Sequence, residues 1–203
     1  MAAMWVFGYG SLMWDPGFPV AAARLARLPG YHRSFCMRSI HHRGTPQAPG
    51  LVLALDAAPG AVCDGLALAV APGAEAATLD YLRARELISS AYLETRQTVH
   101  LGGAAPGQGE PRLETRFETK VEAHVEAVTF VIDPDHVQYC GALPLEEQAD
   151  IIAHAHGDRG PNRDYLWNTA AHLRQLGIAD PDLCWLAERV RSLAPLPAPV
   201  TPS

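Results

Sequence analysis

The chain has 203 residues, of which 48% are hydrophobic and 19% are charged, and its formal net charge is −6. This length and composition are typical of one ordinary globular domain and exclude a disordered chain. A net negative charge gives no overall electrostatic support for binding nucleic acid or an anionic membrane surface, so neither is expected as a partner.

Cysteine usage and hydropathy indicate the compartment. The cysteines at 36, 63, 140 and 184 are scattered, without a Cys-x-x-Cys pair, as is usual for buried thiols in a reducing compartment. No apolar run approaches the roughly 20 residues that a membrane span requires. The N-terminus has no basic leader before an apolar segment, so a secretory signal is not expected. The sequence therefore predicts a cytoplasmic protein without a membrane segment.

The first part of the chain is predicted to be β-structure. The apolar segment Trp5–Phe7 suits a short buried strand, and the Gly8-Tyr9-Gly10-Ser11 turn after it can bring backbone N–H groups close to an anion. Short strands joined by Gly/Pro turns predict a strongly bent antiparallel sheet or barrel. The further strands are expected over 31–39, 51–56 and 62–70, with Pro-Gly turns at 29–30, 59–60 and 72–73.

The rest of the chain is predicted to add helices and one long hairpin. A helix is expected over 75–88, a strand over 96–101 and an extended run over 113–132, with the Gly-rich segment 102–111 as the hairpin tip. The last third predicts three helices, beginning at Pro144, Asn162 and Asp180-Pro181 and punctuated by Gly157 and Gly177. The fold class is therefore α+β. Residues 1–193 are expected to form a single domain and the Pro-rich residues 194–203 a disordered tail.

Glu86 is the acidic residue that stands out as a candidate general base. It lies near the C-terminal end of a predicted helix that packs through Leu79 and Leu82. Burial and the negative helix terminus both raise the proton affinity of a carboxylate, whereas the neighbouring Arg83 and Arg85 oppose this effect. Considered alone, these residues fit a surface glutamate in a salt bridge better than a general base.

Other segments offer further candidates. The basic loop His41-His42-Arg43 lies between two predicted strands and can hold a carboxylate, although a solvated polar loop fits these residues better. Tyr139 and Tyr165 are candidate hydroxyl donors or half-buried packing residues. His154 and His156 are two positions apart, which is not the spacing of a metal pair on a helix, and no metal site is predicted. No Gly-x-Ser-x-Gly elbow and no recognisable Cys–His arrangement is present.

Five segments in one order resemble the ChaC-type γ-glutamylcyclotransferases, which act on glutathione. The resemblance runs from Trp5 to about Leu186, and it implies a small bent β-barrel, antiparallel or mixed, with helices outside and one pocket at its mouth. The segments are VFGYGSLMW at 6–14, HRGTP at 42–46 with Pro49-Gly50, Arg85-Glu86, Tyr139-x-Gly141 with Pro144-Leu145, and GPNRDYL at 160–166.

The resemblance also implies a site and a reaction. Glu86 matches the catalytic glutamate, Tyr9-Gly10-Ser11-Leu12 matches the turn that binds the γ-glutamyl group, and Arg43, Tyr139 and Tyr165 are expected to contact the substrate. The α-amine of the substrate attacks its own side-chain carbonyl, so no nucleophilic residue, metal or organic cofactor is expected. The products from glutathione would be 5-oxoproline and cysteinyl-glycine. The alternatives are other γ-glutamyl amines or amino acids as substrates, a non-catalytic module that binds a carboxylated metabolite, and, with least support, a metal hydrolase.

Overall fold

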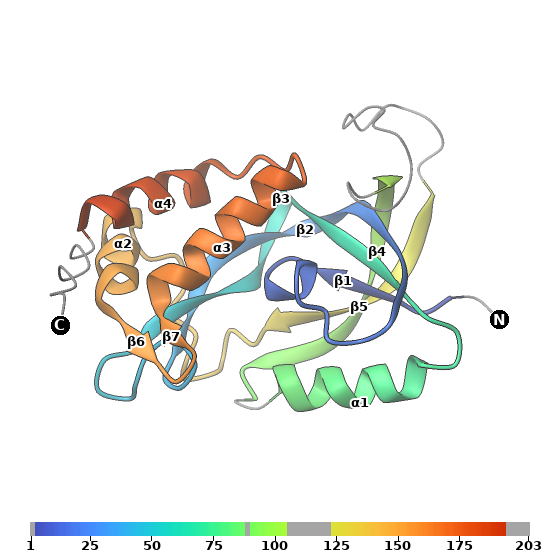
Figure 1. Ribbon diagram of the computed structural model, residues 1–203, viewed down its shortest axis with the longest axis horizontal. Coiled ribbons are helices and arrows are strands. Elements are labelled where there is room, and N and C mark those ends of the chain that lie inside the picture. The colour runs from blue at the N-terminus through green and yellow to red at the C-terminus, as the bar shows by residue number, and fades with distance from the viewer. Residues whose placement is uncertain (1–2, 88–89, 105–122, 194–203) are drawn as a thin grey trace, which may run out of the picture.

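The computed structural model describes residues 3–87, 90–104 and 123–193. Its centre is a closed β-barrel with the strand order β1-β3-β2-β4-β5 (Figure 1). Neighbouring strands pair antiparallel, except β1 and β5, which pair in parallel. The prediction of an α+β protein built on a small mixed barrel is therefore confirmed. The strands are β1 (Trp5–Gly8), β2 (Val20–Ser39), β3 (Gly50–Val70), β4 (Tyr92–Ala104) and β5 (His124–Ile132).

Strands β2 and β3 are longer than predicted, because two of the expected Pro-Gly turns are bends within continuous strands. Gly30 and Gly60 adopt φ values of 81° and 83°, and the pairing of β2 with β3 shifts register between Pro29 and Tyr31. Glycine reaches this left-handed conformation without a steric penalty, so the strands bend sharply and remain paired. The predicted turns at 29–30 and 59–60 are therefore wrong, and the strands expected over 51–56 and 62–70 are one strand.

The barrel is buried on two faces, which explains the uninterrupted apolar character of β1. Side chains alternate along the strand, so Phe7 and Val6 belong to different buried clusters. The Phe7 cluster draws residues from all five strands, as the interior of a barrel does, whereas the Val6 cluster is shared with the helices. The Phe7 cluster comprises Phe7, Tyr9, Ala26, Leu28, Leu55, Cys63, Ala67, Val99, Ala127 and Val131.

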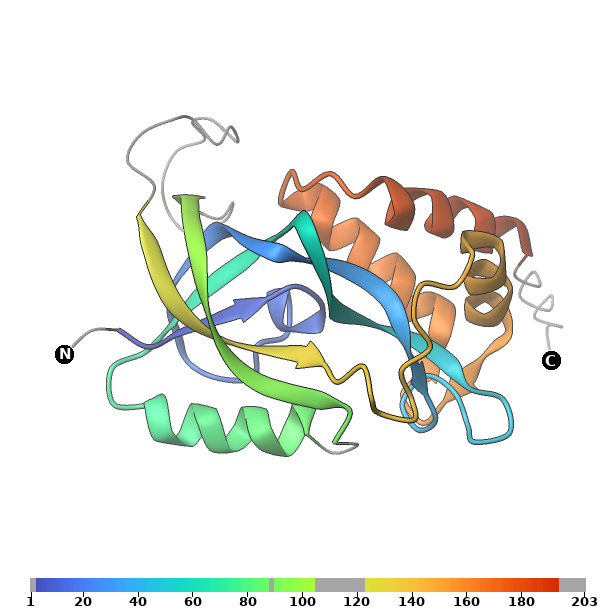
Figure 2. The ribbon, with the colours of Figure 1, turned by 180° about the vertical axis from the view of Figure 1, so that it is seen from behind.

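Helices lie at two places around the barrel (Figures 1 and 2). Helix α1 runs along one side, and the three C-terminal helices pack together on another. These are α1 (Glu75–Glu86), α2 (Leu145–His154), α3 (Asn162–Gln175) and α4 (Pro181–Leu193). All four predicted helices are confirmed, and no helix in the described residues is long and apolar enough to cross a membrane.

The ends of several elements depart from the prediction. Helix α1 ends at Glu86 and not at residue 88, and β4 runs over Tyr92–Ala104 and not only over 96–101. Helix α2 ends at His154 and not at Gly157, because β6 (His156–Gly157) pairs with β7 (Gly160–Pro161) in a short ribbon. Strands β4 and β5 pair as the predicted hairpin. Residues 102–104 of the predicted loop belong to β4, so the loop prediction is wrong there. The remainder of that loop, residues 113–122 of the predicted extended run and the tail predicted over 194–203 lie outside the described residues.

Asn162 attaches the start of α3 to the barrel. Its side chain is fully buried, its Oδ1 accepts the Leu51 N–H at 2.7 Å, and its Nδ2 donates to the Leu51 carbonyl at 2.7 Å. The amide thus pairs with β3 in the manner of a neighbouring strand, so neither polar group of Leu51 is left unsatisfied. This contact places α3, with Tyr165 on its first turn, against the barrel.

Candidate active site

A cavity of about 280 Å³ lies where the turn after β1, the end of α1 and the loop after β2 meet. A 3-10 turn, η1 (Ser11–Met13), follows β1 and contributes one wall. Every residue predicted for the site except Tyr139 lines this cavity. The predicted residues that line it are Tyr9, Gly10, Ser11, Leu12, Arg43, Glu86 and Tyr165.

Tyr139 lies elsewhere. Its hydroxyl donates to Asp56 Oδ2 at 2.9 Å, and its ring packs against a separate buried cluster that includes Cys36 and Met37. The structure gives no support for the predicted substrate contact of Tyr139. Nothing in the sequence distinguishes Tyr139 from Tyr165 as a candidate. Tyr139 is drawn away from the cavity because its segment pairs with β2 at Met37, which only the fold shows.

Glu86 is the last residue of α1 and its side chain is 19% exposed. Burial raises the pKa of its carboxyl group above the ordinary value, and the positive charges of Arg85 and Arg159 partly oppose this shift. A carboxylate with a raised pKa that faces a cavity is suited to accept a proton from a bound ligand. The amphipathic pattern of the helix predicted the position of Glu86, but only the fold shows that it faces a cavity.

Arg85 links Glu86 to the turn after β1. Its Nε lies 3.2 Å from Glu86 Oε1, and its Nη2 donates to Ser11 Oγ at 2.9 Å. Its Nη1 donates to the Asp15 carbonyl at 2.7 Å and to the Tyr81 hydroxyl at 2.9 Å. One guanidinium group therefore holds the turn and the glutamate in a set arrangement. From the sequence, Arg85 is expected to oppose the pKa shift of Glu86, whereas its hydrogen bond to Ser11 depends on the fold.

The turn itself provides hydrogen-bond donors. The Met13 and Trp14 N–H groups donate to the carbonyls of Gly10 and Ser11 at 3.0 and 3.2 Å. The Ser11 and Leu12 N–H groups have no hydrogen-bond partner among the described residues. Such N–H groups at the start of a helical turn favour a negatively charged group nearby.

Three tyrosines lie within electrostatic reach of Glu86, namely the buried Tyr9 and the partly buried Tyr92 and Tyr165. Burial raises the pKa of each hydroxyl, to about 12 for Tyr165, and the Glu86 charge adds to the effect. These hydroxyls therefore remain protonated donors at neutral pH. Tyr92, whose hydroxyl donates to the Leu53 carbonyl at 3.0 Å, was not predicted for the site. Tyr92 lies shortly after Glu86 in the sequence, and this proximity is the signal that could have identified Tyr92 as a site residue.

The loop 41–43 and the β6–β7 ribbon form the opposite wall of the cavity. The Asp158 and Arg159 N–H groups donate to the carbonyls of His41 and His42 at 2.8 and 3.0 Å. Arg43 Nη1 donates to the Arg159 and Pro161 carbonyls at 2.7 and 3.2 Å. The Arg43 guanidinium also lies over the Tyr165 ring, 5.6 Å from its centroid. Burial and the neighbouring positive charges lower the pKa of His42, which keeps this wall from gaining further charge.

Gly157 allows this wall to form, and Gly157→Ala is expected to disrupt it. A Cβ at Gly157 would lie 2.4 Å from the His41 carbonyl oxygen and 2.5 Å from the Gly44 nitrogen. Because both contacts are backbone atoms, we expect a loss of about 2 kcal/mol of unfolding free energy. Chemical denaturation measures this loss. Gly103→Ala is the control, since a Cβ there meets no atom of the described residues within 4 Å, and equal stability of the two variants would contradict the prediction.

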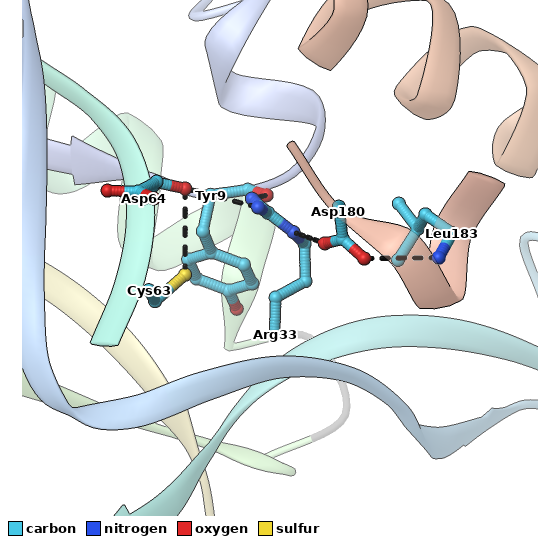
Figure 3. A network of polar contacts seen from close by, with 6 residues as sticks. All are labelled: Tyr9, Arg33, Cys63, Asp64, Asp180 and Leu183. Atoms are coloured by element: carbon cyan, nitrogen blue, oxygen red, sulfur yellow. Dashed lines mark hydrogen bonds and ion pairs between the residues drawn. The ribbon is translucent and has the colours of Figure 1, made fainter. Parts of the chain in front are cut away.

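A buried arginine supports the turn from behind (Figure 3). The Arg33 side chain is 4% exposed, and its Nη1 and Nη2 donate to the carbonyls of Tyr9 and Asp64 at 2.7 and 3.1 Å. Its Nε donates to Asp180 Oδ2 at 3.0 Å, and Asp180 Oδ1 accepts the Leu183 N–H at the start of α4. Arg33 therefore ties the turn to β3 and α4. A single arginine within a strand carries no sequence signal for this role.

The histidines weighed as metal ligands do not gather at one place. His154 Nδ1 lies 2.8 Å from the Asp150 carbonyl oxygen, and the His172 ring lies 5.7 Å from the Trp14 ring between centroids. Within the ranges that the structure describes, no three His, Cys, Asp or Glu side chains are grouped as metal ligands would be.

Comparison with known proteins identifies the family. The sequence model of the ChaC-like proteins matches residues 4–193. The chain belongs to the ChaC-like family. This ChaC-like chain is 37% identical to "Gamma-glutamylcyclotransferase 2-3" of Arabidopsis thaliana, across 94% of the chain and 90% of the relative. It is 32% identical to the "Glutathione-specific gamma-glutamylcyclotransferase" of Escherichia coli, across 94% of the chain and 74% of the relative.

A solved structure shares the fold of this ChaC-like protein. The γ-glutamylcyclotransferase specific to glutathione from yeast superposes with a TM-score of 0.80 at 24% identity, and the match covers 96% of this chain and 98% of the yeast chain. The barrel and the helices around it are therefore the architecture common to both proteins.

Proposed function

We propose that this ChaC-like protein is a γ-glutamylcyclotransferase that converts glutathione into 5-oxoproline and cysteinyl-glycine. The observation that carries the proposal is the desolvated Glu86 carboxylate, which faces a cavity that the Tyr9–Leu12 turn also lines. The choice of glutathione is supported by the relatives from Escherichia coli and Homo sapiens, which are named glutathione-specific and are 32% and 29% identical to the chain.

In the proposed reaction the substrate supplies its own nucleophile. The α-amine of the γ-glutamyl group attacks the γ-carbonyl carbon and closes a five-membered lactam, and the bond from that carbon to the cysteine nitrogen breaks. Glu86 accepts the proton that the α-amino group loses and delivers it to the departing nitrogen. A cavity that holds the glutamyl chain bent brings the amine to the carbonyl and so converts restricted motion into rate.

The polar groups around Glu86 have separate tasks in this proposal. The Ser11 and Leu12 N–H groups hold the α-carboxylate, next to the guanidinium of Arg85, which already bonds Ser11. The Tyr9 and Tyr165 hydroxyls, which stay protonated because of burial, donate to the oxygen that becomes negative as the ring closes. Arg43 supports Tyr165 from the opposite wall.

Product analysis tests the proposal. Purified protein incubated with glutathione is expected to release 5-oxoproline and cysteinyl-glycine in equal amounts, measured by mass spectrometry. Faster release of 5-oxoproline from a simple γ-glutamyl dipeptide would favour the broader cyclotransferase. Binding of glutathione without any release would favour a non-catalytic module. A cytoplasmic location belongs to the same proposal, and it is supported by the four free cysteines.

The pH dependence of the reaction is expected to report Glu86. Because the base must be deprotonated to accept a proton, kcat/KM should fall as the pH falls through the raised pKa of this carboxyl group. The acid limb of the profile should therefore lie above the ordinary glutamate value of 4.5. Initial rates across a pH series measure the limb, and a limb at or below the ordinary value would contradict the assignment.

A further inference from the structure

Arg159 differs from the other arginines of the cavity. It lines the cavity from the turn between β6 and β7, and its guanidinium makes no hydrogen bond or ion pair with any of the residues that the structure describes. By contrast, Arg43 donates to two carbonyls and lies over a tyrosine ring. Arg85 is occupied by Ser11, Asp15, Tyr81 and Glu86. Arg159 is thus the cavity arginine left available to an incoming anion.

The backbone of Arg159 is held although its side chain is unpaired. Its N–H donates to the His42 carbonyl at 3.0 Å, and its carbonyl accepts Arg43 Nη1 at 2.7 Å. Gly160, which follows it, has a φ of 91° that closes the turn. A held backbone reduces the freedom that the side chain loses when it binds, so the position is suited to recognition.

We propose that Arg159 binds the distal carboxylate of the substrate and thereby selects γ-glutamyl peptides that end in a free carboxylate over γ-glutamyl amines and amides. This inference rests on the proposed cyclotransferase function and names the substrate class. A guanidinium group matches a carboxylate by two parallel hydrogen bonds, which favours recognition of a planar anion. In glutathione the matching group is the glycine carboxylate.

The arrangement of the cavity agrees with this assignment. The Ser11–Leu12 turn and Glu86 lie on the side of the reacting γ-glutamyl group, whereas Arg159 belongs to the wall formed by the loop 41–43 and the β6–β7 ribbon. The two residues beyond the γ-glutamyl group span about 7 Å when extended. The Arg159 charge also lowers the pKa of Glu86. Arg159 is therefore within electrostatic reach of the reacting end.

Equilibrium binding tests the assignment without turnover. Glutathione and its C-terminal amide are titrated by calorimetry into Glu86→Gln protein, and into the same protein that also carries Arg159→Gln. We expect Arg159→Gln to weaken the binding of glutathione about tenfold, as the loss of one charged hydrogen-bonded pair would. The binding of the amide should stay nearly unchanged. Arg163→Gln is the matched control, because it removes the same charge four positions away and does not line the cavity.

Kinetics on the active protein give a second readout. Arg159→Gln should lower kcat/KM for glutathione and not for the amide, and should move the acid limb to higher pH because a charge that lowers the Glu86 pKa is lost. An equal loss for both substrates, or no loss for either, would overturn the role of Arg159. A wild-type protein that releases no 5-oxoproline overturns the proposed function, whereas the binding comparison still decides the carboxylate assignment.

Discussion

Replacing Glu86 with glutamine is expected to lower the turnover of glutathione about 1,000-fold, within the usual contribution of a general acid–base residue. Glutamine preserves the shape of the side chain, but it cannot accept the proton that the α-amino group must lose. The release of 5-oxoproline, followed by mass spectrometry, measures the effect. Asp80→Asn is the control, because Asp80 lies on an exposed part of the same helix and should retain wild-type turnover.

The stability of the same variant separates catalysis from folding. Because burial raises the Glu86 pKa, the folded protein binds this proton more tightly than the unfolded chain does. The carboxylate therefore costs stability as the pH rises from 4.5 through the raised pKa. Glu86→Gln removes this cost, so its Tm at neutral pH should equal or exceed that of the wild type. Turnover close to the wild-type value in a folded variant would remove Glu86 from the role of base.

Replacing Arg33 with methionine is expected to cost about 3 kcal/mol of unfolding free energy, as the loss of one partner from a buried ion pair does. Methionine fills similar space, but it removes the hydrogen bonds that Arg33 donates to the Asp180 carboxylate and to the carbonyls of Tyr9 and Asp64. Since the Tyr9 carbonyl begins the turn that lines the cavity, kcat for glutathione should also fall. Chemical denaturation and steady-state kinetics measure the two effects.

The two effects of Arg33→Met can be distinguished. Kinetics are measured well below the Tm of the variant, where the protein is folded and a purely structural role would leave kcat unchanged. Asp180→Asn is the companion variant, because its Oδ1 can still accept the Leu183 N–H at the start of α4. We expect a smaller loss of kcat in Asp180→Asn than in Arg33→Met, since the contact of Arg33 with Tyr9 remains. An unchanged kcat in folded Arg33→Met would contradict the positioning role.

Local features of the chain were predictable. The apolar segment Trp5–Phe7, the glycine turn after it and the helix that carries Glu86 each follow from residues close together in sequence, which is the range over which periodicity and turn chemistry act. The order of the segments that resemble the ChaC-type proteins then joined Glu86 to the turn. The predictions from local sequence were wrong where strand pairing decides the backbone path, because a Pro-Gly pair can either end a strand or bend it. The neighbouring strand determines which occurs at Gly30 and Gly60.

The sequence by itself therefore determined the fold class, the four helices, the candidate glutamate and the turn beside it. Only the tertiary structure decided which charged side chains are occupied and which remain available. Arg33 meets Asp180 across 147 positions of the chain, and Arg159 comes within electrostatic reach of Glu86 although the two are far apart in sequence. Burial and partnership of this kind depend on packing between distant segments, and no local pattern records them.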